Sequence, residues 1–163
     1  MRDFISLSLV SWSLHSYWTE TRPVGLPYAF ITHFIHDLPV CDIVFKLHHL
    51  LGVTVACYGI LVPTTPMMMP TYGTEVSTPL FYATKWCPHG LRTPIRLLFV
   101  GTFYTTRIHN YGNALMAWSP YADPYPVLGI VGFYGLYALN LYWFNCMLRT
   151  ALRSTLPFFA ARA

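Results

Sequence analysis

The sequence predicts an all-α protein, a polytopic membrane bundle of four to six transmembrane helices. Hydrophobic residues make up 55% of its 163 residues and charged residues only 10%, against about 25% in soluble domains. Long runs lack any Asp, Glu, Lys or Arg, and two of them cover residues 47–74 and 124–148. The net charge of +4 is small and forms no basic patch, so the composition argues against a nucleic-acid-binding protein.

The apolar runs, and the Pro and Gly residues between them, set the expected helices. We expect helices at 4–19, 28–40, 47–62, 76–84, 95–118 and 127–148. The first is short for a span, which needs about 20 residues, and is interpreted as a tilted helix or the remnant of a longer one. The fourth is interpreted as a short span or a re-entrant helix. Three prolines predict a loop at 63–70.

The domain organisation expected from this pattern is one bundle with short ends. Residues 1–27 form a membrane or interfacial segment, 28–152 the bundle, and 153–163 a short basic tail. Arginines without nearby acids at the C-terminal end predict that this end faces the cytoplasm or the matrix. The four cysteines are far apart and lack CxxC spacing, so we expect them to be reduced.

Polar residues inside the apolar sequence mark the candidate site. His48 and His49 stand at the start of a long apolar run, where histidines without partners are costly to bury. Arg107 lies within the fifth expected helix and should pair with an acid of the bundle, of which Glu75 is favoured. Asn140 lies near the centre of the last expected helix and should bond across helices. Together with Ser77, Arg107 and Asn140 are expected to form a structural polar network.

Five sequence blocks occur in an order that resembles the TLC-domain family, which includes the ceramide synthases and the translocating-chain-associating membrane protein. The blocks read Phe-Ile-His-Asp-Leu at 34–38, Leu-His-His-Leu-Leu at 47–51, Thr-Glu-Val-Ser-Thr-Pro at 74–79, Thr-Phe-Tyr-Thr-Thr-Arg-Ile at 102–108 and Leu-Asn-Leu-Tyr-Trp-Phe at 139–144. Together they cover roughly residues 28 to 150. Ceramide synthases carry a His-Asp-x-x-Asp motif where this chain has Thr74, Glu75 and Thr78. The chain therefore looks more similar to the small TLC-domain proteins, with a shortened N-terminus.

The resemblance implies a role in membrane lipid metabolism, either of sphingolipids or of phospholipid acyl chains, or in control of lipid composition. It implies an endoplasmic reticulum membrane protein without a bound cofactor. If the chain is an enzyme, it would be an N- or O-acyltransferase with acyl-CoA as co-substrate. The alternative is a non-catalytic structural or accessory subunit of a larger membrane complex, and the alternative location is the mitochondrial inner membrane. Membrane lipids are the expected partners in the first case and proteins in the second.

The residues themselves allow an acyl-transfer site. His48 or His49 is the candidate base, and Glu75 or Asp37 the acid that orients the imidazole. Adjacent residues on a helix point about 100° apart, so only one histidine is expected to face a cavity. Two alternatives stay open: the same groups fix helix register without turnover, or His48, His49 and His36 bind zinc or iron together with an acid. Since no His-x-x-x-His spacing supports the second, no metal site is assigned.

Overall fold

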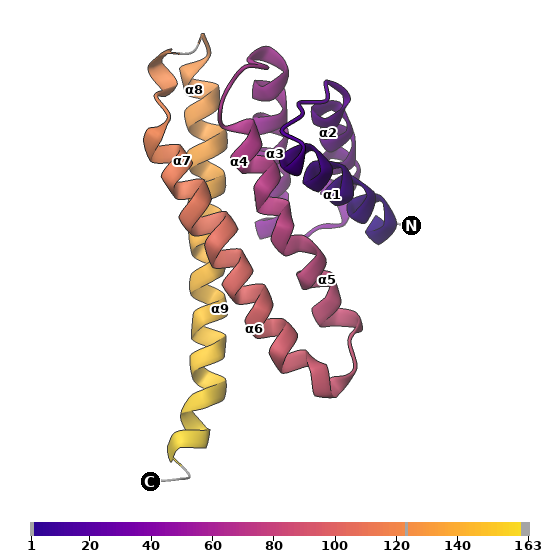
Figure 1. Ribbon diagram of the computed structural model, residues 1–163, viewed down its shortest axis with the longest axis vertical. Helices are drawn as coiled ribbons and strands as arrows, with labels where there is room; N and C mark the ends of the chain where they lie inside the picture. The colour runs from indigo at the N-terminus through magenta and orange to yellow at the C-terminus, as the bar shows by residue number, and fades with distance from the viewer. Residues whose placement is uncertain (1, 123, 161–163) are drawn as a thin grey trace.

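The computed structural model describes residues 2–122 and 124–160, with side chains over 7–39, 41–121 and 124–150. All regular secondary structure in these ranges is helical, as the sequence predicts. The helices are α1 (Arg2–Trp18), α2 (Gly25–Asp37), α3 (Ile43–Leu61), α4 (Met68–Gly73), α5 (Thr78–Trp86), α6 (Arg92–Phe103), α7 (Tyr111–Ala117), α8 (Pro126–Gly129) and α9 (Gly135–Ala160). A 3-10 turn joins α4 to α5, and π-helical turns join α6 to α7 and α8 to α9. The result is an elongated bundle (Figure 1).

Two helical stretches of the described chain are long and apolar enough to cross a membrane, Ile43–Leu61 and Pro126–Thr150. At a rise of 1.5 Å per residue they extend about 28 Å and about 37 Å, close to or beyond the roughly 30 Å hydrocarbon core. The other helical stretches of the described chain, 2–18, 25–37, 68–86 and 92–117, are not both long and apolar enough. Two candidate spans are therefore present, and the larger number of four to six transmembrane helices stays a prediction.

The predicted loop at 63–70 is too long, because a helix begins at Met68. Pro70 is the third residue of that helix. The first turn of an α-helix makes no use of its backbone N–H groups within the helix, so a proline is tolerated there. The fourth helical stretch consequently covers 68–86 and carries Glu75 in its interior rather than near its start.

The long C-terminal helix packs against α3 through small residues. A Cβ atom on Gly132 would lie 2.9 Å from a methyl carbon of Val55, and one on Gly135 would lie 2.6 Å from Leu51. Glycine at these positions therefore allows the two apolar helices to approach closely. Beside this contact the buried rings of Tyr58, Trp118 and Phe133 pack edge to face. This packing holds α3, with its histidine pair, against the end of the bundle formed by α7 and α8 (Figure 1).

Candidate functional site

A cavity opens between α2, α3, α4, α9 and the π-helical turn Tyr104–Asn110. The cavity has a volume of about 50 Å³, enough for a few water molecules or a thin chain. One part of the wall is polar and is formed by His48, Glu75, Arg107 and Asn140. Most of the rest is apolar, with Phe30, Phe34, Val55, Met68 and Leu136 among its residues. An apolar cavity with a few converging polar groups is typical of a ligand site.

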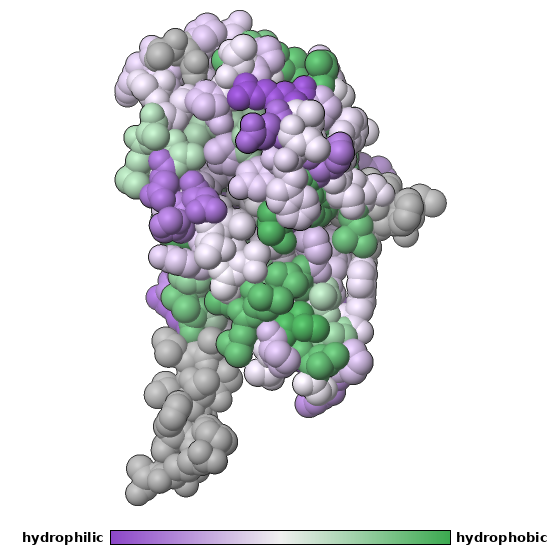
Figure 2. Space-filling model, in the orientation of Figure 1, coloured by the Kyte–Doolittle hydropathy of each residue, from purple (hydrophilic) through white to green (hydrophobic). Residues whose placement is uncertain are grey.

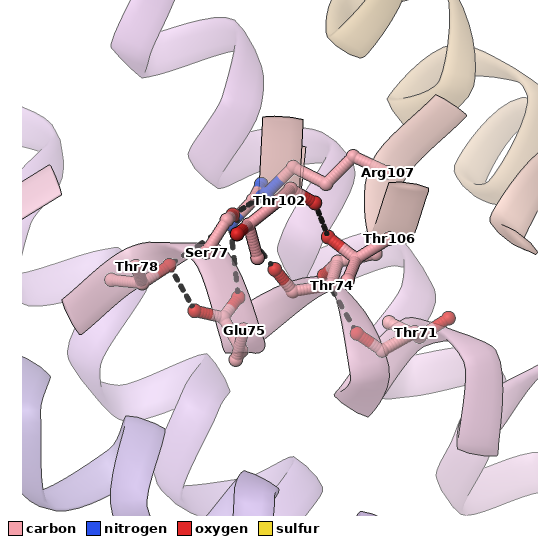
Figure 3. A network of polar contacts seen from close by, with 8 residues as sticks. All are labelled: Thr71, Thr74, Glu75, Ser77, Thr78, Thr102, Thr106 and Arg107. Carbon is pink, nitrogen blue, oxygen red and sulfur yellow. Dashed lines mark hydrogen bonds and ion pairs between the residues drawn. The ribbon is translucent and has the colours of Figure 1, made fainter. Parts of the chain in front are cut away.

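Arg107 is the centre of the polar wall, and Glu75, Ser77 and Thr78 complete what we term the arginine cluster (Figure 3). Its Nε donates to Oγ of Ser77 at 2.9 Å, and its Nη2 donates to Oγ1 of Thr78 at 3.0 Å. Nη2 also lies 3.8 Å from Oε1 of Glu75. Arg107 and Glu75, which the sequence predicts to pair, thus form an ion pair, and two hydroxyl groups add to it: that of Ser77, a predicted member of the same polar network, and that of Thr78, which was not predicted.

Local backbone geometry brings these side chains together. Glu75 and Ser77 lie in the 3-10 turn Thr74–Ser77, and Arg107 lies in the π-helical turn that faces it. Such departures from α-helical geometry occur often at functional sites. Thr78 then links the groups a second time, because its Oγ1 donates to Oε2 of Glu75 at 2.7 Å. Arg107 is only 8% exposed, and this set of partners is what its burial requires.

His48 lines the cavity and His49 does not, in line with the expectation that only one of the two faces a cavity. The rings of Phe34 and Trp143 lie against His48, with centroids at 5.9 Å and 5.2 Å. Its Nδ1 is buried and has no hydrogen-bond partner among the described residues. Glu75 does not orient it, since both carboxylate oxygens of Glu75 face the arginine cluster.

Asp37 and His49 meet at the turn between α2 and α3, away from the cavity. Cys41 joins them, and its Sγ lies 3.4 Å from Nε2 of His49. The acceptor or donor atoms of the three side chains all lie within 4.8 Å of one another, and we term them the hairpin cluster. The four residues predicted to form one catalytic site are thus divided: His48 and Glu75 line the cavity, and Asp37 and His49 lie in the hairpin cluster.

Two other polar residues lie outside the cavity wall and both clusters. Asp42 is the N-cap of α3, where its Oδ1 accepts from the backbone N–H groups of Val44 and Phe45, both at 3.0 Å. Its carboxylate is therefore engaged in capping. His109 is exposed and contacts Asn110 and Asn113 of its own helical stretch.

Tyr72 forms another part of the cavity wall, outside the two candidate spans. Burial raises the pKa of its hydroxyl to about 12, and the nearby charge of Arg22 opposes part of that rise. The phenol therefore stays neutral at physiological pH and keeps its proton.

Comparison of the chain with protein-family models, with curated proteins and with solved structures gives no match.

Proposed function

We propose that the chain is a multi-pass membrane protein of TLC type that acts on the acyl chains of membrane lipids, in the endoplasmic reticulum. The observation that carries this proposal is the cavity whose apolar wall meets His48 and Arg107. An acyl chain is apolar along its length and carries a polar carbonyl at one end. It therefore matches a narrow cavity with a single polar wall.

The chemistry that this wall supports is acyl transfer from acyl-CoA to an amine or a hydroxyl. The acceptor attacks the thioester carbonyl, and His48 takes the proton that the acceptor loses. The guanidinium of Arg107 stabilises the oxyanion that forms on the carbonyl. When the carbon–sulfur bond breaks, His48 returns the proton to the departing thiolate. Glu75 has a supporting role, because it holds Arg107 rather than the imidazole.

A second function, that of a structural subunit in a larger membrane complex, rests on the outer surface. Figure 2 shows apolar side chains gathered over the region of α5 and α6. Large apolar residues there are highly exposed, among them Trp86 at 60%, Leu97 at 66% and Leu98 at 58%. A surface of this kind suits lipid tails, and it equally suits a protein partner within the membrane.

Mass spectrometry of the full chain, purified in a mild detergent, separates the two functions. The first predicts a chain that runs alone with bound acyl lipid. Ala56→Phe, which would fill the cavity from α3, should remove most of that lipid, whereas Ala83→Phe on α5, outside the cavity wall, should leave it in place. A chain found only in fixed stoichiometry with other proteins, and without acyl lipid, would contradict the first function and favour the second.

A further inference from the structure

We propose that the hairpin cluster is a zinc site, with the carboxylate of Asp37, the thiolate of Cys41 and Nε2 of His49 as ligands. The cluster is separate from the cavity, since none of these three residues lines it. The proposal therefore does not depend on the function proposed above.

Distances within the hairpin cluster fit tetrahedral coordination. Zinc bonds of roughly 2.0 to 2.3 Å place two neighbouring ligand atoms about 3.3 to 3.7 Å apart. Sγ of Cys41 and Nε2 of His49 are 3.4 Å apart. All three ligand atoms lie within 4.8 Å of one another, so small side-chain rotations suffice to close the site around an ion.

Asp37 provides the independent sign of a missing cation. It is 5% exposed, and its Oδ1 is buried and accepts no hydrogen bond from the described residues. Two histidines lie within ion-pair distance but beyond hydrogen-bond distance: Nδ1 of the largely exposed His36 is 3.6 Å from Oδ1, and Nε2 of His33 is 3.9 Å from Oδ2. A buried carboxylate oxygen without a hydrogen bond is costly. A metal ion would give Oδ1 the close contact that it lacks, and a thiol and an imidazole lie beside it as further ligands.

The types of ligand select the metal. Calcium and magnesium prefer sets of oxygen atoms, whereas one thiolate, one imidazole and one carboxylate suit zinc. Two anionic ligands balance the charge of Zn²⁺, which suits an ion that is buried at the end of an apolar helix. His33 lies one helical turn before Asp37, with its Nε2 3.9 Å from Oδ2 of Asp37, and is a candidate for the fourth ligand.

Position in the fold gives the site its role. Asp37 ends α2, Cys41 lies in the turn, and His49 lies in the second turn of α3. An ion held by all three would fix the α2–α3 hairpin. It would also fix the rotation of α3, and with it the direction of the neighbouring His48 toward the cavity.

The test uses the full chain in detergent, stripped with a chelator and then supplied with Zn²⁺ or Co²⁺ alone. We expect about one metal ion per chain by elemental mass spectrometry, and a thiolate-to-cobalt charge-transfer band in the near ultraviolet. Cys41→Ser should abolish the band and weaken zinc binding on the order of tenfold or more. Cys57→Ser, a change of another partly buried cysteine outside the cluster, should leave both unchanged.

Two results would overturn the proposal. One is wild-type protein that binds cobalt without a thiolate band, or binds far less than one ion per chain. The other is an equal band in Cys41→Ser, which would place the thiolate elsewhere. If Cys41→Ser does not fold, far less than one ion per wild-type chain, or loss of the band in Cys57→Ser, still overturns the proposal.

Discussion

The arginine cluster and the hairpin cluster both bury a charge, yet they do so in different ways. Arg107 has its counter-ion and two hydroxyl partners within the protein, at 2.9 to 3.8 Å. Asp37 has two histidines within ion-pair distance, at 3.6 and 3.9 Å, but its buried Oδ1 accepts no hydrogen bond from the described residues. The first cluster is complete as it stands, whereas the second has its ligand atoms in place around a site for an ion. A group of polar residues in an apolar bundle therefore has to be judged by whether its members satisfy one another.

None of the residues of the hairpin cluster lines the cavity, but one ring contacts a histidine of each. The centroid of Phe34 lies 5.9 Å from that of His48 and 5.0 Å from that of His49. Gly52 allows this packing, because a Cβ there would lie 2.5 Å from Cε2 of Phe34. The cavity and the hairpin thus share one aromatic wall.

The largest expected effect is loss of the arginine cluster. Arg107→Met leaves Glu75 without its counter-ion, and breaking a buried ion pair from one side lowers stability by about 3 to 5 kcal/mol. The free energy of unfolding in detergent is the measurement, and the loss should be the same with and without a chelator. Arg107→Lys should restore only part of it, because a lysine cannot reproduce the fork of donors to Ser77 and Thr78. Equal stability of Arg107→Met and wild type would show that the cluster contributes nothing.

A smaller effect is expected at the start of α3. Asp42→Ala removes the N-cap and should lower stability by about 1 kcal/mol. Asp42→Asn keeps a capping oxygen and should lose only a few tenths of that value, which makes it the matched control. Because Asp42 follows Cys41 directly, the same Ala variant should also weaken metal binding by the hairpin cluster. Unchanged stability in Asp42→Ala would contradict the capping role.

Much of the fold follows from patterns in the sequence. Uncharged runs separated by Pro and Gly indicate most of the helices, and glycines recur every three residues, at 129, 132 and 135, where the last span approaches its neighbours closely. The start of the fourth helix could not be placed, because a proline in a first turn has the same sequence signal as a proline in a loop.

The candidate site could be predicted only in part. The partner of Arg107 follows from the small number of acids in the chain. The role of Cys41 does not, because its distance to His49 depends on the backbone of the intervening turn, where Cys41 is extended with φ −90° and ψ 152°. No helical spacing relates two residues on either side of such a turn. The sequence also placed Asp37 and Glu75 in one candidate site, because both are acids near the histidine pair in the chain. In the structure Asp37 belongs to the hairpin cluster and Glu75 to the arginine cluster.

The central claim is that His48 serves a reaction in the cavity, and an acyl-transfer assay tests it directly. The full chain in lipid vesicles is given acyl-CoA and a long-chain amine or alcohol, and the acylated product is measured. We predict transfer by the wild type, a loss of roughly 100-fold or more in His48→Asn, and full activity in His109→Asn, which alters an exposed histidine. Equal transfer by the two variants, or none by the wild type, would contradict the claim and leave the cavity as a feature of helix packing.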